Sequence, residues 1–260
     1  MNMNILVCCK AVPDPEQVIH VAEGRPEVVV DDGTELRMNH YDEFAIEEAV
    51  LIKETHPGAS VTAITMGPEA ARKILKRAIG MGADNGIHIV CDYPLSCDAA
   101  AVSACIAQIA GEKAFDLIFC GIMSEDMMQF QVGPMLAWRL SIPWTTAVIR
   151  ESVNPDAGTV SVLRELEGGV TATMDIRLPA LLTIQSGINE PRYPALSKLL
   201  RADASRIQVI PEDALMRPGP QSQTVGYGFP EKKRAGLILT GSPDEKAEKL
   251  LRLLREKALL

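Results

Sequence analysis

Short apolar runs alternate with longer amphipathic stretches through the first 150 residues. The runs have the length and aliphatic content of strands that are buried on both faces. They cover 4–9, 60–66, 86–90 and 116–120. The stretches between them have apolar residues at helical spacing. They lie between Asp42 and His56, at 69–79 and at 98–111. This alternation predicts an α/β fold with a doubly wound, mostly parallel sheet and helices on both faces.

Several shorter elements complete the prediction. Residues 18–30 alternate apolar and polar side chains and predict a hairpin, and Asn39 or Asp42 can cap the helix that follows. Beyond residue 150 the pattern changes to three further strands, at 159–165, 170–176 and 180–184, and a short helix over 195–200.

The last third of the chain has fewer apolar repeats. Residues 205–236 are rich in Pro, Gly and polar residues, so we expect them to lie across another surface. An amphipathic helix is predicted over 244–260, which either docks on a partner subunit or packs on its own domain. We therefore predict an α/β nucleotide-binding domain over 1–204, which includes the added strands of 159–184, and an arm with a terminal helix over 205–260.

The loop after the strand at 116–120 is the strongest candidate for a ligand site. The strand ends in Gly121, a polar loop follows, and Gln131-Val132-Gly133-Pro134 begins a helix. In an open parallel sheet, ligands bind at the carboxyl ends of strands, and the unpaired amides of a helix start suit a phosphate. The alternative is an ordinary strand-to-helix connection without a ligand.

Composition and charge exclude several classes of protein. The chain has 260 residues, of which 47% are hydrophobic, and its net charge of −8 argues against nucleic acid as the main partner. The basic run from Arg72 to Arg77 is accordingly interpreted as a solvated helix face. No apolar run is long enough to cross a bilayer, and the chain enters its first strand without a secretory signal. We expect a location in the cytoplasm, or in the mitochondrial matrix if the source is a eukaryote.

The sequence shows no catalytic constellation. The four histidines are not at ligand spacing, and neither a nucleophile elbow nor a phosphate-loop motif occurs. Glu47 and Glu48 are interpreted as a solvated helix face. The six cysteines are expected to be reduced thiols, with no disulfide and no metal site. This favours binding, carrying or assembly over bond-making, so we do not expect an enzyme.

Motifs along nearly the whole chain resemble the beta subunit of electron transfer flavoproteins. The motifs share both their order and their spacing with that family. They are Asn39-His40-Tyr41-Asp42-Glu43, Thr65-Met66-Gly67-Pro68, Gly82-Ala83-Asp84, Gln131-Val132-Gly133-Pro134, Val162 to Gly169, Leu178 to Thr183, and Asn189-Glu190-Pro191-Arg192-Tyr193.

The resemblance implies a heterodimer with an alpha subunit that holds most of the redox FAD. It implies AMP in this subunit or, in electron-bifurcating members, a second FAD. The implied nucleotide site comprises Cys8, Asn39, His40, Tyr41, Asp42, Met66, Gly121, Ile122, Met123, Ser124, Asp126, Gln129, Phe130, Gln131 and Val132. Backbone groups near Cys8 and Met66 would read the adenine, the amides of 130–132 would hold the phosphate, and Tyr41 would face the flavin of the alpha subunit.

The resemblance also implies a segment that anchors flavin dehydrogenases, over 189–201. Its implied contact residues are Tyr193, Ala195, Leu196 and Leu199. An exposed leucine on a short helix suits a neighbouring pocket, and the alternative for Leu196 is a place in the core.

The resemblance predicts that the chain carries electrons from acyl-CoA or similar dehydrogenases to an acceptor such as a membrane quinone oxidoreductase. A bifurcating variant with NADH as donor is the main alternative within the family. The rival from another class is a stand-alone adenine-nucleotide sensor.

Overall fold

The computed structural model describes residues 3–17, 20–21, 28–29, 35–91, 98–201, 204–216, 218–219, 221–222, 225–226 and 236–259. The chain divides into two compact units, Met1–Tyr227 and Gly228–Leu260. The first unit contains the sheet and all but one of the labelled helices, whereas α6 (Pro243–Glu256) belongs to the second.

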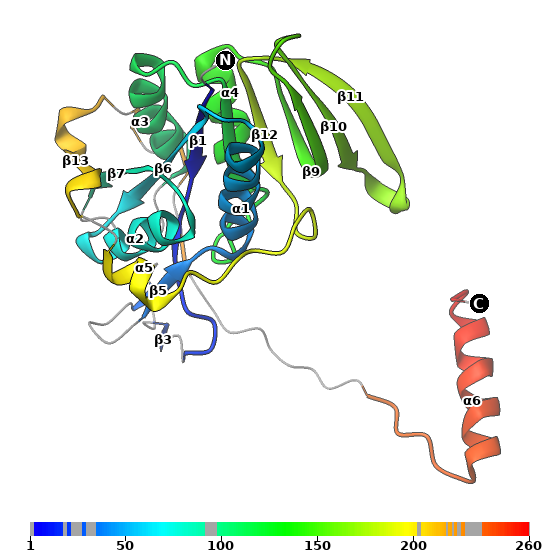
Figure 1. Cartoon of the computed structure of the whole chain (residues 1–260). Coiled ribbons are helices and arrows are strands. Elements are labelled where there is room, and N and C mark those ends of the chain that lie inside the picture. Colours follow the sequence, from blue (N-terminus) through cyan, green and yellow to red (C-terminus); the bar gives the residue numbers. More distant parts are fainter. Residues whose placement is uncertain are drawn as a thin grey trace. The chain divides into compact units, whose positions relative to one another are not determined.

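A nine-stranded sheet is the centre of the first unit (Figure 1). Its strands follow the order β11-β10-β9-β12-β8-β1-β6-β7-β13. The parallel part consists of β12 (Ala180–Ile184), β8 (Leu117–Gly121), β1 (Asn4–Cys8), β6 (Ser60–Gly67), β7 (Asn85–Val90) and β13 (Ile207–Pro211). β9 (Trp144–Asn154) is parallel to β12, and β10 (Thr159–Glu165) is antiparallel to both β9 and β11 (Thr171–Arg177). The predicted mostly parallel sheet is confirmed.

Helices cover both faces of this sheet because the side chains of its central strand alternate between two cores. Ile5 and Val7 of β1 belong to the core that packs under α1 (His40–Thr55) and α2 (Arg72–Met81). Leu6 and Cys8 belong to the core that packs under α3 (Ala99–Glu112) and α4 (Val132–Leu140). This two-sided burial explains the continuous apolar run of the strand and confirms the doubly wound prediction.

Smaller elements surround the sheet. Two short antiparallel pairs are formed by β2 (Ala11–Pro13) with β5 (Leu36–Met38), and by β3 (His20–Val21) with β4 (Val28–Val29). The second pair lies inside the predicted hairpin, of which 18–19, 22–27 and 30 are outside the described residues. The helix α5 (Leu196–Arg201) confirms the short helix, and single 3-10 turns occur at Glu69–Ala71, Glu167–Gly169, Ala204–Arg206 and Glu212–Ala214.

The stretch 205–236 contains a strand that its sequence did not indicate. β13 pairs with β7 from Ile207↔Gly86 to Pro211↔Val90 and forms the edge of the sheet. Only Ile207 of this strand is buried, so the run lacks the alternation by which strands are recognised. The compact unit therefore extends past residue 204, and the division of the chain falls at 227/228.

The second unit contains the predicted terminal helix. α6 begins with a capping box, in which the Ser242 side chain accepts from the Glu245 amide and the Glu245 carboxylate accepts from the Ser242 amide. No residue of α6 is buried. Among the described residues, no helix combines the length and the apolar character needed to cross a membrane.

Candidate functional site

A cleft opens at the carboxyl ends of the central strands. The chain passes from β1 to β6 and β7 on one side and then returns to β8 on the other side of β1, so β1 marks the topological switch point. The cleft encloses about 1020 Å³, solvent at its mouth included, and its lining includes Cys8, Met66 and Gly121 from the ends of these three strands. Ligands bind at this place in open parallel sheets.

The structure brings together most of the residues that were predicted to bind a nucleotide. Those that line the cleft are Cys8, Asn39, Asp42, Met66, Gly121, Ile122, Met123, Ser124, Gln129, Phe130, Gln131 and Val132. His40, Tyr41 and Asp126 are not among the lining residues. Asp126 lies one contact away, since the Lys10 ammonium is 2.7 Å from its carboxylate. Tyr41 packs on the backbone behind Gly121, where an added Cβ would be 2.7 Å from the tyrosine Cβ.

The loop between β8 and α4 forms one wall of the cleft. It starts with a hydrogen bond from the Ile122 amide to the Ile184 carbonyl, 2.9 Å, which extends the pairing of β8 with β12. Met128 and Phe130 adopt positive φ angles of 50° and 56°, conformations that non-glycine residues seldom adopt. Both side chains are exposed, at 60% and 51%. The helix α4 begins at Val132 with Pro134 in its first turn, as predicted.

Asp42 ties the ends of two strands together at the floor of the cleft. Its buried carboxylate accepts hydrogen bonds from the Lys10 amide, 2.7 Å, and the Gly121 amide, 3.0 Å. Burial raises the pKa of Asp42 to about 7, although these hydrogen bonds and one from Asn39 oppose the rise. The predicted cap position is confirmed for Asn39, which is the N-cap residue of α1, but the Asn39 side chain makes no capping hydrogen bond.

The side chain of Asn39 bonds to the loop after β8 and not to the first turn of α1. Its amide group donates to the Met123 carbonyl, 2.9 Å, and accepts from the Glu125 amide, 3.0 Å. The two candidate capping residues therefore connect α1 to β1, to β8 and to the loop after β8.

Lys10 is the most important lining residue that the sequence analysis missed. It follows β1 directly, lines the cleft, and lies with its ammonium group 3.4 Å from the Ser124 hydroxyl as well as beside Asp126. Its position as the first residue after a predicted strand was the available signal. The apolar walls were also missed, and they include Ile64, Val102 and Ile106.

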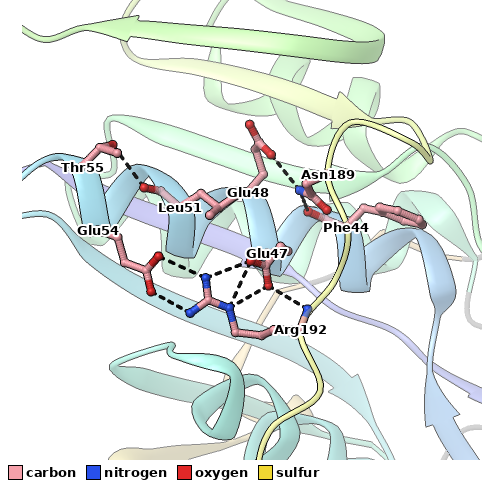
Figure 2. Close-up of polar contacts among 8 residues, drawn as sticks. All are labelled: Phe44, Glu47, Glu48, Leu51, Glu54, Thr55, Asn189 and Arg192. Carbon is pink, nitrogen blue, oxygen red and sulfur yellow. Dashed lines mark hydrogen bonds and ion pairs between the residues drawn. The ribbon is translucent and has the colours of Figure 1, made fainter.

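The second predicted site is the segment over 189–201, the recognition segment, which was expected to anchor a dehydrogenase. Figure 2 shows how its first part is fastened to α1 by Asn189 and Arg192. Asn189 donates to the Phe44 carbonyl, 3.0 Å, and to the Glu48 carboxylate, 2.7 Å. The Arg192 guanidinium lies 2.8 Å from Glu47, whose side chain is only 4% exposed.

The interpretation of Glu47 and Glu48 as a solvated helix face is therefore wrong. Both are buried, at 3% and 8% exposure, because the recognition segment covers this face of α1. The Arg192 guanidinium also lies 2.6 Å from the carboxylate of Glu54, whose side chain is about half exposed to solvent. Charged residues at helical spacing look solvated in a sequence whether or not a distant segment covers them.

The recognition segment presents its apolar side chains to solvent. Tyr193 is 88% exposed and Leu196 is 70% exposed, so Leu196 is not a core residue. The Arg77 guanidinium lies 5.5 Å from the centre of the Tyr193 ring. Leu199 is half-buried and packs against Gly80 of α2, where a Cβ would come within 2.8 Å of its methyl group. Ala195 is exposed.

Buried Glu48 on α1 and half-buried Glu151 on β9 form a pair of neighbouring carboxyl groups. Burial and the neighbouring Glu48 raise the pKa of Glu151 to about 8, and burial raises the pKa of Glu48 as well. A folded-state pKa above the ordinary 4.5 means that the folded protein holds the proton more tightly than the unfolded chain. Stability from Glu151 is thus complete below pH 4.5 and is lost as the pH rises through 8.

Known proteins of one family resemble the chain in sequence over nearly its whole length. The profile of the electron transfer flavoprotein domain matches residues 27–215. The chain is 37% identical to the electron transfer flavoprotein subunit beta of Bacillus subtilis, over 98% of this chain and 99% of the relative. It is 31% identical to the protein of that name from Homo sapiens, over 94% and 95%, and 30% identical to that of Methylophilus methylotrophus, over 98% of each.

Proposed function

This chain belongs to the electron transfer flavoprotein family as a beta subunit, and from that premise we propose that it carries electrons together with an alpha subunit. The carrier would take electrons from acyl-CoA or similar flavin dehydrogenases and deliver them to an acceptor such as a membrane quinone oxidoreductase. The observation that supports this best is the cleft at the switch point of the sheet, where most of the predicted nucleotide residues meet. We expect the work to take place in the cytoplasm or, in a eukaryote, in the mitochondrial matrix.

We propose that the cleft binds AMP. Its apolar walls, from Ile64, Met66, Val102 and Ile106, suit the flat face of an adenine ring. The phosphate would lie between Lys10 and the amides at the start of α4, where a cation and a helix N-terminus attract the same charge. A second FAD is the alternative occupant.

The redox FAD would be held mainly by the alpha subunit and would supply the electron-carrying chemistry. The contribution of this chain would be to bind the nucleotide and to orient the flavin. Tyr41 is half-buried behind Gly121 and is the side chain that we expect to face the flavin.

We propose that the recognition segment anchors the dehydrogenase. Tyr193, Ala195 and Leu196 are exposed, whereas Leu199 secures the short helix to α2. An exposed leucine held on a fastened support loses little conformational freedom on binding, which favours its use as an anchor.

Nucleotide content tests the carrier function directly. The chain would be co-expressed with a neighbouring alpha-type subunit, purified, denatured, and assayed for released FAD and AMP. One FAD and one AMP per heterodimer are expected. Two FAD without AMP would replace this proposal by a bifurcating flavoprotein and make NADH oxidation the next assay. Failure of a yellow partner to co-purify would favour a stand-alone nucleotide sensor.

A pair of lysine variants tests the position of AMP. Lys10→Met is expected to weaken AMP binding about tenfold, since one charge-assisted contact contributes about 1.5 kcal/mol. Lys53→Met is the matched control, because Lys53 is also paired with an aspartate and has a similar exposure, 29% against 31%. Calorimetric titration that found equal losses for both variants would contradict a phosphate beside Lys10.

A further inference from the structure

Two cysteines stand side by side on the floor of the cleft. Cys8 of β1 and Cys120 of β8 are partners in the parallel register, so their side chains point to the same face of the sheet. Neighbouring strands lie about 4.8 Å apart, which brings the two sulfur atoms close together. The Cys120 thiol shares a hydrogen bond with Cys8, and both residues line the cleft.

The neighbouring Cys9 does not share this arrangement. Cys9 also contributes to the lining of the cleft, but its side chain belongs to the core on the opposite face of the sheet. Its thiol points to the Val7 carbonyl at 3.8 Å. Cys8 and Cys120 therefore form a pair of thiols that is reached from the cleft, whereas Cys9 serves as an internal control.

The surroundings of the pair define the ligand that it suits. Among the described residues, no group of three or more His, Cys, Asp or Glu side chains is arranged to hold a metal ion, so the two thiols have no third side chain of these four types beside them. Soft sulfur ligands select soft, thiophilic centres. The nearby walls are apolar, with Ile64, Val102 and Ile106, and accommodate an aryl group.

The protonation of the thiols separates two kinds of chemistry. The hydrogen bond with Cys8 and burial both raise the pKa of Cys120 well above its ordinary value. The thiolate form of Cys120, which is the form that attacks a peroxide, is therefore scarce. Condensation with an oxide, in contrast, uses the protons of both thiols to form water.

We propose that Cys8 and Cys120 form a dithiol site that chelates trivalent organoarsenic compounds, and that the arsenical and a nucleotide exclude each other from the cleft. In the reaction two As–S bonds form and the As=O unit is lost, its oxygen leaving as water with the two thiol protons. Arsenic remains trivalent and no electron is transferred. Chelation itself does not depend on the proposed function, whereas the exclusion of a nucleotide rests on it.

The probe is phenylarsine oxide, applied to the full chain in complex with its alpha-type subunit after charcoal removal of nucleotide. We expect one phenylarsenic group on this chain that survives a glutathione wash, which removes adducts of single thiols, and that dimercaptopropanol releases. Peptide mapping by mass spectrometry should join the peptides that contain Cys8 and Cys120. Cys8→Ser and Cys120→Ser should each lose the resistant adduct, and Cys9→Ser should keep it.

Added AMP separates the two parts of the proposal. At about one hundred times its dissociation constant, AMP should slow chelation about one hundredfold, because only the empty cleft reacts. Absence of a resistant adduct, or its survival in Cys8→Ser, overturns the dithiol site even if AMP binds. Chelation that proceeds unchanged while AMP is shown to be bound overturns the exclusion alone. Failure of AMP to bind contradicts the proposed nucleotide and leaves the chelation result standing.

Discussion

The contact between Arg192 and Glu47 offers a strong test of how the recognition segment is held. Replacing Arg192 by Gln removes the guanidinium that lies 2.8 Å from a carboxylate with 4% exposure. Breaking a buried ion pair by removing one partner costs about 3–5 kcal/mol, because the remaining charge is left without compensation. Arg192 itself is 31% exposed, so water can partly replace it. We therefore expect the free energy of unfolding to fall by about 2–3 kcal/mol, which is just below that range.

Arg72 provides a matched control for this prediction. Its side chain is 30% exposed, almost the same as Arg192, but its partner Glu69 is 67% exposed. A surface ion pair of this kind contributes about 0–1 kcal/mol, so Arg72→Gln should have a small effect. The difference between the two variants reports the burial of the carboxylate and not the loss of an arginine.

The assay is urea unfolding of the full chain, followed by the fluorescence of its two tryptophans, Trp138 and Trp144. A lower midpoint with an unchanged m value would report lost stability. Adding Glu47→Gln to Arg192→Gln should restore at least about 1 kcal/mol, because it removes the uncompensated charge. Equal midpoints for Arg192→Gln and Arg72→Gln, or no recovery in the double variant, would refute the reasoning.

Three further predictions test other parts of the molecule. Glu151→Gln should be more stable than the parent chain above pH 8 and similar to it near pH 4, because the carboxyl group of Glu151 has a pKa of about 8 and is ionised only at the higher pH. Melting temperatures of both proteins over a pH series test this prediction, and a difference that stays constant with pH would contradict it. Gly121→Ala should lower both the melting temperature and the AMP affinity, since the added Cβ would lie 2.7 Å from the Cβ of Tyr41. Gly111→Ala is the control, because a Cβ at Gly111 would meet open space, and it should be neutral or stabilising by up to about 1 kcal/mol. Leu196→Ala should change the free energy of unfolding by less than about 0.5 kcal/mol and should weaken binding to an acyl-CoA dehydrogenase about tenfold or more. Binding is measured by surface plasmon resonance, and an unchanged affinity would show that Leu196 is not the anchor.

Much of the fold follows from local patterns in the sequence. The central strands are continuous apolar runs because each is covered by helices on both faces, and that property is visible without a structure. β13 was missed for the opposite reason, since an edge strand with one buried residue has no distinctive pattern. The positions of the helices were also predictable, although α2 begins at Arg72 and not at 69, and α6 ends at Glu256 and not at 260. The partners of Asn39 and Asp42 were not predictable, because their hydrogen bonds go to residues 32 to 86 positions away.

The sequence by itself determined the alternation of strands and helices, the position of the loop after β8, and the motifs that identify the family. These depend on neighbouring residues, whose spacing the chain already contains. Only the tertiary structure decided that Glu47 is buried under Arg192, that Lys10 reaches the cleft, and that Cys8 stands beside Cys120. Each of these facts joins residues more than one hundred positions apart or depends on what covers a surface. Such contacts are set by the packing of whole elements, which no local pattern records.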